Sequence, residues 1–471
     1  MKLKHVSLSV MMMGATTVAM ASGYHFGTQS VSAQSTANAS AAEAANASTI
    51  FYNAAGMTKL EGTNFSGALS LVAPSVKYSG ATGNYTTPAA PGAVRPIAGP
   101  IAGQTSGKIT DDLVAVPQMY LTHQLNEKVT VGLGIYVPFA SETEYQRDSV
   151  LRYNLNATSL KTMDINPTVA LKLNEQHSVA VGVVAQHAEA TLRQYANHGA
   201  AVPGGLGGGN GTFDGYAEVD GDDWGFGYNL AWLWDVNDST RVGVNYRSKI
   251  EHDLKGSAKW TRSTDALAGG PGNAVAVLVK GLFPDSEDAS VKITTPESLS
   301  LHAMHKLDRK VTVFGDLTWT KHSRFDTAQL KYATPKVALP AVNQGDTTYL
   351  NPQWKDTYKI SLGGAYQYSE PLQLRVGIAY DKSPVPDDNH RLATIPDNDR
   401  YWFSLGGKYD LNKQSSIDFA YSYIHIKDAK ANVDSRCTTL GQTTCVSSQT
   451  VGTASYKASA QILGVQYNHR F

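Results

Sequence analysis

The connections between strand-like segments constrain this chain more than any other feature, because short and long connections take turns along it. Six are tight polar turns, which begin near Asn126, Asn174, Asn237, Asp308, Ser369 and Asn412. Seven are long stretches rich in Gly, Pro, Ser, Thr and Asp, near 79–111, 140–158, 196–221, 261–290, 332–354, 382–398 and 430–454. Such connections join fourteen strands with both chain ends on the short-turn side, which is the asymmetry of an outer-membrane β-barrel. A soluble domain has no reason to segregate its loop lengths so regularly.

Within the strand-like segments, apolar and polar residues alternate. Leu372, Leu374, Val376 and Ile378, for example, share one face, and polar or small residues occupy the other. A soluble β-sandwich also alternates, so the loop lengths decide between the two folds. No water within lipid can satisfy an unpaired strand edge, so the antiparallel sheet must close. A barrel of fourteen strands is too wide for its own side chains to fill, and leaves either a water channel or room for a plug.

The N-terminus has the form of a secretory signal peptide over residues 1–21. Two lysines precede an apolar run from Val6 to Met20, and Ala19-Met20-Ala21 matches an A-x-A cleavage site, so the mature chain should begin near Ser22. No later apolar run approaches the roughly 18 residues that a membrane-spanning helix requires, which excludes a helical membrane protein. Lys+Arg and Asp+Glu number 40 each, so charge does not favour nucleic acid as a partner.

Residues 22–60 are the only candidate for a plug, which leaves residues 61–471 for the barrel. The stretch 46–57 combines an aromatic residue, Phe51, with a turn formed by Asn53, Ala54, Ala55 and a glycine. Asn is favoured in such turns because its side chain mimics backbone. We therefore expect Asn53 to anchor the plug.

These features together resemble the FadL family of outer-membrane transporters for hydrophobic compounds. The hatch of that family carries an Asn-Pro-Ala turn in this setting, where the present chain has Ala54 in place of proline. The resemblance runs over most of the chain, through Asp223-Trp224-Gly225-Phe226-Gly227, Tyr246-Arg247-Ser248-Lys249, Asp381-Lys382-Ser383-Pro384-Val385 and Ile395-Pro396-Asp397-Asn398-Asp399-Arg400-Tyr401-Trp402. It implies a monomeric barrel that takes up hydrophobic molecules, above all long-chain fatty acids, by passive diffusion.

In the implied mechanism, solute lands on extracellular loops, enters an internal pocket and leaves when the hatch shifts. Arg193 is similar to the family arginine that meets the solute's polar head, and a guanidinium suits a carboxylate. The alternative for Arg193 is an ion pair with an acid in the lumen. Leu350 falls where the family has a second cation, with Lys331 and Lys355 as nearby substitutes, so an uncharged hydrocarbon is a further alternative.

The segment Val129 to Phe139 resembles the family's kinked third strand, where a lateral opening meets the hatch. Gly132 and Gly134 leave gaps in side-chain packing and Pro138 removes a ladder donor, which together favour a bend that opens the wall. The alternative is that the two glycines only make room for the plug.

An apolar run lies in the long connection near 261–290, which the topology places outside the cell. Its largest side chains are those of Val277, Leu278, Leu282 and Phe283. An apolar surface of this size needs a partner. It is either a landing site for a hydrophobic solute or a cap packed on neighbouring loops.

The last long connection and the end of the chain each carry a further signal. Cys437 and Cys445 are the only cysteines, and in an exported chain such a close pair predicts a disulfide that staples a loop. After that loop, Tyr467, His469 and Phe471 alternate up to a terminal aromatic residue. This ending resembles the signal by which the barrel-assembly machinery recognises its substrates.

Other function classes find little support. No serine lies in a Gly-x-Ser-x-Gly motif, so we expect no enzyme, and no cofactor. The acidic residues within 385–399 lack the regular spacing of a calcium loop, and we expect a solvated acidic loop there and no metal site. The remaining rivals to a transporter are a structural or adhesive surface barrel and a general porin. The expected partners are hydrophobic small molecules and the lipids of a Gram-negative outer membrane.

Overall fold

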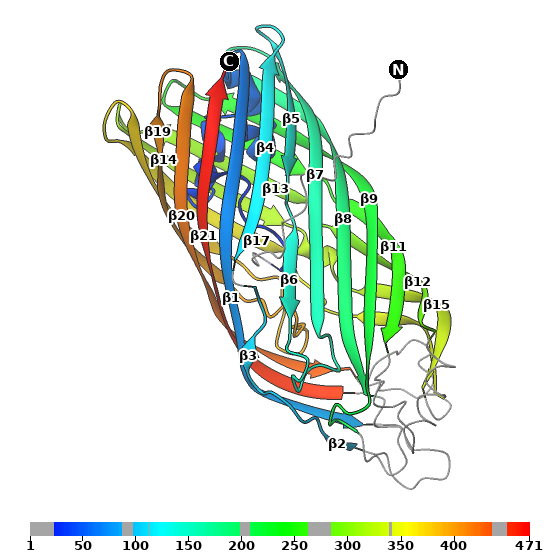
Figure 1. Cartoon of the computed structure of the whole chain (residues 1–471). Helices are drawn as coiled ribbons and strands as arrows, with labels where there is room; N and C mark the ends of the chain where they lie inside the picture. The colour runs from blue at the N-terminus through cyan, green and yellow to red at the C-terminus, as the bar shows by residue number, and fades with distance from the viewer. Residues whose placement is uncertain are drawn as a thin grey trace, which may run out of the picture.

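The computed structural model describes residues 23–86, 98–111, 113–197, 208–261, 284–338, 342–435 and 450–471. They form one antiparallel sheet that closes on itself, because the first strand pairs with the last (Figure 1). The register of this closing ladder runs from Asn64 opposite Arg470 to Tyr85 opposite Thr450. The closed barrel predicted from the sequence is confirmed.

Within the described residues, the wall contains fourteen strands built from a larger number of segments. The segments are β1 (Thr63–Thr86), β2 (Ala98–Pro100), β3 (Gly107–Lys108), β4 (Val114–Gln124), β5 (Val129–Tyr136), β6 (Ala140–Glu144), β7 (Ala157–Lys172), β8 (His177–Asn197), β9 (Asp214–Asp235), β10 (Thr240–Arg247), β11 (Ile250–Thr261), β12 (Ser286–Thr295), β13 (Ser298–Lys306), β14 (Val311–Thr320), β15 (Ala328–Ala338), β16 (Val342–Leu350), β17 (Thr357–Gln367), β18 (Leu372–Asp381), β19 (Arg400–Asp410), β20 (Ser415–Asp434) and β21 (Thr450–Arg470). β2 and β3 belong to the first long connection. Five wall strands are each split in two, as β5 with β6, β10 with β11, β12 with β13, β14 with β15, and β16 with β17.

The short turns form because of the residue that opens them. The Asn126 Oδ1 accepts hydrogen bonds from the backbone N–H groups of Lys128 at 2.9 Å and Val129 at 3.0 Å. These two bonds stabilise the reversal of the chain. The same pair of bonds recurs at Asn174, Asn237, Asp308 and Asn412. The predicted tight turns therefore owe their regularity to one repeated local geometry.

One predicted loop is wrong. The connection expected near 332–354 is mostly a continued hairpin, in which β15 and β16 pair with Leu330 opposite Thr348. Strands such as β9, which begins at Asp214, likewise extend into the stretches expected to be loops. Polar composition alone does not distinguish a loop from a strand that extends out of the membrane into solvent.

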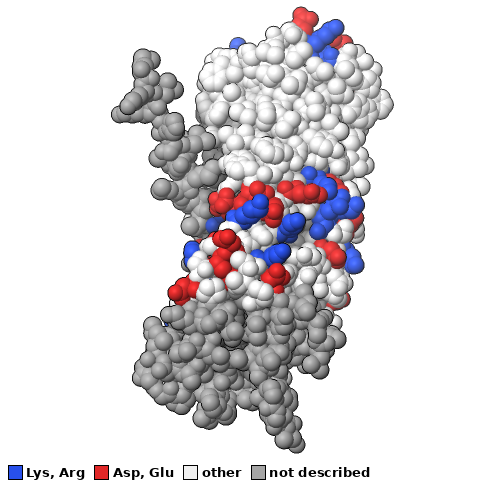
Figure 2. Space-filling view, turned by 90° about the vertical axis from the view of Figure 1, so that its right-hand side faces the viewer, with Lys and Arg blue, Asp and Glu red and all other residues white. Residues whose placement is uncertain are grey.

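The outward face of the wall is apolar over a broad zone. Leu362, Val376 and Leu405 are 58%, 59% and 58% exposed, which only a lipid environment makes favourable. Figure 2 shows one face of the wall, on which a broad zone without charged side chains lies between a belt of Lys, Arg, Asp and Glu and a few charged side chains at the opposite end. Among the described residues, no helix has both the length and the apolar character needed to cross a membrane.

Residues 23–60, which we call the N-terminal segment, lie inside the barrel (Figure 1). They form α1 (Val31–Gln34), η2 (Ala39–Glu43), α2 (Thr49–Tyr52) and η3 (Ala54–Lys59). The wall packs tightly against this segment, since a Cβ built on Gly377 would lie 2.0 Å from the backbone of Thr36. Buried charges fasten it, since Arg375 pairs with Glu43 at 2.8 Å and Lys59 pairs with Asp235.

Candidate solute cavity and wall break

A largely apolar cavity lies inside the barrel, with an empty volume of about 700 Å³. We call it the apolar cavity. Its lining comes from the N-terminal segment, from six wall strands and from the connection between β18 and β19, and includes Tyr24, Leu160, Leu192, Val291, Ile293, Leu392 and Ile395. Side chains of this kind exclude water and offer a hydrophobic solute a favourable place to rest.

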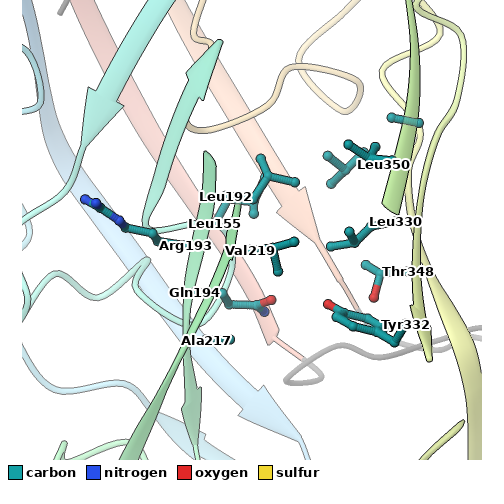
Figure 3. Close-up of a pocket in the computed structure, with 12 residues that line it drawn as sticks. Leu155, Leu192, Arg193, Gln194, Ala217, Val219, Leu330, Tyr332, Thr348 and Leu350 are labelled. Carbon is teal, nitrogen blue, oxygen red and sulfur yellow. The ribbon is translucent and has the colours of Figure 1, made fainter. Parts of the chain in front are cut away.

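A second cavity, of about 440 Å³, adjoins the first and shares Leu155, Leu192, Val291, Ala328 and Leu350 with it. Figure 3 shows Leu192 and Val219 facing Leu330 and Leu350 across this space, with the Tyr332 and Thr348 hydroxyls nearby. The two cavities together form one elongated apolar space.

Arg193 lines the second cavity, but its guanidinium is already paired. Its Nε donates to Glu218 Oε2 at 2.9 Å, and its Nη1 lies 3.3 Å from Glu144 Oε2. The guanidinium points away from the leucines in Figure 3. The ion pair that was one reading of the sequence is therefore present, and a role for Arg193 in binding a polar head stays a prediction.

No second cation faces these cavities among the residues that line them. Leu350 contributes to both. Lys331 and Lys355 are exposed and line neither cavity. Among the described residues that line these two cavities, an anionic solute would therefore find Arg193 as its one cation, and would compete for it with two glutamates.

The third wall strand is broken between β5 and β6. The ladder with β7 passes from Tyr136 opposite Asp164 to Ala140 opposite Lys161, so three residues on one strand face two on the other. On its other side, β4 pairs with β5 only as far as Met119 opposite Ile135. This bulge leaves the wall between β4 and β6 without a ladder in the described residues.

The N-terminal segment occupies that break. The Phe26 N–H donates to Pro138 O at 2.8 Å, and the Ala140 N–H donates to Tyr24 O at 2.7 Å. His25 forms an isolated antiparallel bridge with Phe139. Three residues of the N-terminal segment thus make backbone contacts where the neighbouring strand makes none. Moving these residues would leave the break in the wall unfilled.

Gly132 and Gly134 lie before the break, in the regular part of β5. A Cβ on Gly132 would lie 2.5 Å from Met57 Sδ, and one on Gly134 would lie 3.2 Å from Ile50 Cγ2. Both glycines therefore admit the N-terminal segment. The interruption itself falls at 137–139.

Asn53 joins its own turn to the wall. Its Oδ1 accepts the Ala55 N–H at 3.1 Å, while its Nδ2 donates to Trp232 O at 3.0 Å and Val244 O at 3.2 Å. Ala54 and Ala55 are fully buried. Phe51 packs edge-on against Tyr136, with ring centroids 5.1 Å apart. All four predicted residues of this turn region thus contact the barrel or lie buried within it.

The family described as outer membrane protein transport protein (OMPP1/FadL/TodX) matches residues 12–471. The chain belongs to this family. It is 45% identical over 465 residues to outer membrane protein NMB0088 of Neisseria meningitidis serogroup B, covering 96% of this chain and 95% of that one. It is 28% identical over 336 residues to the long-chain fatty acid transport protein of Escherichia coli K12, covering 67% of this chain and 72% of that one.

Solved structures show the same fold as this FadL-family chain. A Pseudomonas aeruginosa FadL homologue matches with a TM-score of 0.78 and 21% identity, covering 95% of this chain and 100% of that one. The Pseudomonas putida toluene transporter TodX matches with a TM-score of 0.62 and 18% identity, covering 90% and 94%. The chain is thus an outer-membrane β-barrel of a transport family.

Several predicted residues of this FadL-family chain lie outside the described residues. They are the signal peptide 1–21, the apolar loop residues Val277, Leu278, Leu282 and Phe283, and the cysteines Cys437 and Cys445. The landing site and the disulfide stay predictions.

The acidic connection between β18 and β19 is held by ion pairs. Asp397 is fully buried, pairs with Arg400, and accepts the Gly23 N–H at 3.0 Å. Asp399 pairs with Lys382 and Lys427, each at 3.1 Å. The solvated loop expected from the sequence is wrong for Asp397, which anchors the start of the N-terminal segment.

Sequence reasoning missed Tyr24 and Trp354, whose rings stack at 5.2 Å beside the apolar cavity. A signal was present, since Tyr24, His25 and Phe26 form an aromatic cluster just after the predicted cleavage site. The cavity leucines carry no such signal, because they come from distant strands that meet only in the closed barrel.

Proposed function

We propose that this chain takes up hydrophobic compounds across the outer membrane by passive diffusion. The observation that carries the proposal is the apolar cavity of about 700 Å³, enclosed by a barrel whose N-terminal segment also fills a break in the wall. Solute enters from the extracellular connections, rests in the cavity and leaves when the N-terminal segment moves as a hatch.

The exit in this proposal is lateral. A solute that steps from the cavity through the break at 137–139 into lipid avoids exposing apolar surface to water, which costs roughly 25 cal/mol per Å². The contacts of Tyr24 and Phe26 with Pro138 and Ala140 support this route, because a movement of the N-terminal segment away from the wall would break both.

Long-chain fatty acids are the first substrate class that we propose. The similarity to fatty acid transport proteins supports it, and so does Arg193 beside the second cavity. An uncharged hydrocarbon is the second candidate, favoured by the two glutamates that already hold Arg193.

Uptake in cells that lack their own transporter distinguishes the candidates. We would compare labelled oleate with labelled naphthalene, in the parent chain and in Arg193→Gln. If fatty acids are the substrate, Arg193→Gln should lower oleate uptake and spare naphthalene. Equal uptake of oleate by both chains would favour the hydrocarbon, and uptake of neither solute by the parent would reject the transport proposal.

A further inference from the structure

The wall has a second interruption, between β9 and the split strand β10–β11. β9 pairs with β10 from Asp235 to Asn229, and with β11 from Asp222 onward. The β9 residues 224–227 have no ladder partner on this side, in a part of the wall that is fully described. An unpaired ladder inside a membrane wall is costly, so it calls for an explanation.

Side chains close the two ends of this gap. The Tyr228 N–H donates to Ser248 Oγ at 2.9 Å, and the Asp253 N–H donates to Asp223 Oδ2 at 2.9 Å. At the first end the Ser248 N–H also donates to Tyr228 O at 2.9 Å. The gap is therefore framed by polar contacts, and no ladder bond joins the two strands between them.

Ile250 fills the middle of the gap. A Cβ on Gly225 would lie 2.5 Å from Ile250 Cγ2, and one on Gly227 would lie 2.7 Å from Ile250 Cγ1. The isoleucine thus sits in a notch that only glycine leaves free. Ile250 is 5% exposed and forms the aliphatic part of the seal, beside the Glu251 carbonyl oxygen, which would lie 2.7 Å from the same Cβ on Gly225.

A cavity of about 430 Å³ lies behind this seal. On one side it reaches His25 and Phe139 at the break in the third wall strand, and on the other it reaches Tyr228, Ser248 and Ile250. We call it the linking cavity. It also touches Thr295, which lines the apolar cavity. The linking cavity therefore reaches both wall interruptions, and Thr295 lies between it and the apolar cavity.

The lining of the linking cavity is more polar than that of the apolar cavity. Arg247 donates to Tyr136 Oη at 2.7 Å and pairs with Asp164 at 3.1 Å, and its Nη1 has no partner among the described residues. Such a lining suits the hydrogen-bonding head of an amphipathic solute. Outside the gap, Trp224, Phe226 and Tyr228 are 45%, 71% and 47% exposed, and form an aromatic surface toward lipid for the apolar tail.

We propose that the gap between β9 and β11 is a second lateral portal, sealed by Ile250, through which an amphipathic solute passes between the linking cavity and the membrane. This inference rests on the proposed function, since it needs a solute inside the barrel. Displacing Ile250, together with the contacts of Glu251 and His252 with Gly225, would open the portal while the ladders on either side remain intact.

A disulfide across the seal tests the proposal. Gly227→Cys with Ile250→Cys places the two sulfurs within bonding reach, in a background with Cys437→Ser and Cys445→Ser. Oxidation should lower oleate uptake, and dithiothreitol should restore it, whereas each single-cysteine variant should respond to neither. Unchanged uptake with the cross-link verified by mass would overturn the portal, and failure of the two cysteines to cross-link would overturn the contact on which it stands.

Opening the seal gives the opposite test. Ile250→Ala should raise oleate uptake severalfold, while the matched control Ile360→Ala, an outward isoleucine in a complete ladder, should leave it unchanged. Uptake by Ile250→Ala equal to that of the parent would contradict the portal.

Photolabelling with a diazirine fatty acid separates this inference from the proposed function. Labelled Leu192 and Val291 together with labelled Ile250 support both. Label in the apolar cavity without label at Ile250 overturns the portal only. Label confined to outward residues such as Leu362 overturns both.

Discussion

Single buried side chains connect the N-terminal segment to the wall, and Asn53 shows how much of this a sequence reveals. Its place in an Asn-Ala-Ala-Gly turn predicts the bond to the Ala55 N–H, because that bond is local. Its bonds to Trp232 and Val244 depend on two strands nearly two hundred residues away, which no local pattern indicates. Arg193 is similar, since its paired glutamates become neighbours only across strand ladders.

We predict that Asn53→Ala loosens the N-terminal segment while the barrel still assembles. The Ala55 N–H would lose its acceptor in a buried site, and such an unpaired group costs about 1–3 kcal/mol. Uptake of labelled oleate should fall, and protease should cut the segment faster, with heat-modifiable gel migration retained. Asn64→Ala, at an exposed site, serves as the control. Normal uptake and normal protease resistance in Asn53→Ala would remove the anchoring role.

At the scale of elements, local sequence patterns predict the strands but do not predict where the strands are interrupted. The fourteen-stranded barrel could be predicted from six tight turns, such as those at Asn126 and Asn412, from seven long connections and from alternation such as that from Leu372 onward. The break at 137–139 was expected nearby because of Pro138. The gap opposite Ile250 was not expected. It arises where the registers of β10 and β11 against β9 differ, and register depends on the pairing of two strands, which a single segment of sequence does not reveal.

The position of Gly132 makes a prediction about β5. Gly132→Val should push against Met57 and Ile50 and displace the N-terminal segment, since even a Cβ would lie 2.5 Å from Met57 Sδ. We expect a higher ion conductance in planar bilayers and a changed rate of oleate uptake. Gly364→Val is the matched control, because the nearest atom to its Cβ would be 3.7 Å away. Equal conductance in both variants would show that the segment tolerates the added bulk.

The connection between β18 and β19 should respond to acid. Burial alone would raise the pKa of Asp399, but hydrogen bonds from the Ser383 N–H, Lys427 and Lys382 outweigh it and lower that pKa to about 2. A lowered pKa stabilises the folded connection above the unfolded value of about 3.9, and this stability is lost as the pH falls toward the folded value.

Hydrogen exchange of residues 382–399, corrected for its intrinsic pH dependence, measures this effect. Protection should be constant from neutral pH to about pH 4 and should decline below it, because the unfolded carboxyl begins to bind protons near pH 3.9. Asp399→Asn should show reduced protection at neutral pH, and its difference from the parent should shrink as the pH falls toward 2. A variant as well protected as the parent at neutral pH would rule out the contribution of the carboxylate.

At the scale of the whole molecule, the N-terminal segment decides whether the barrel is a channel. A fourteen-stranded wall is wide enough to conduct ions unless something fills it. Deleting residues 24–60 should therefore give a large, steady conductance in planar bilayers, and the intact chain should give little. Circular dichroism and heat-modifiable migration would verify that the shortened chain still folds. A large steady conductance of the intact chain would instead favour a general porin.

The burial of Gly23 ties the proposed gating to maturation of the protein. Gly23 donates to the buried Asp397, and its Cα lies so close to Trp354 that a Cβ would come within 2.3 Å of the indole ring. If the predicted leader of 21 residues is removed, the new terminus begins one residue before this enclosed site. Proteolytic removal of the leader would then do more than release the chain from the export machinery, because it would set the free end of the chain beside Asp397, at the start of the segment that fills the break at 137–139.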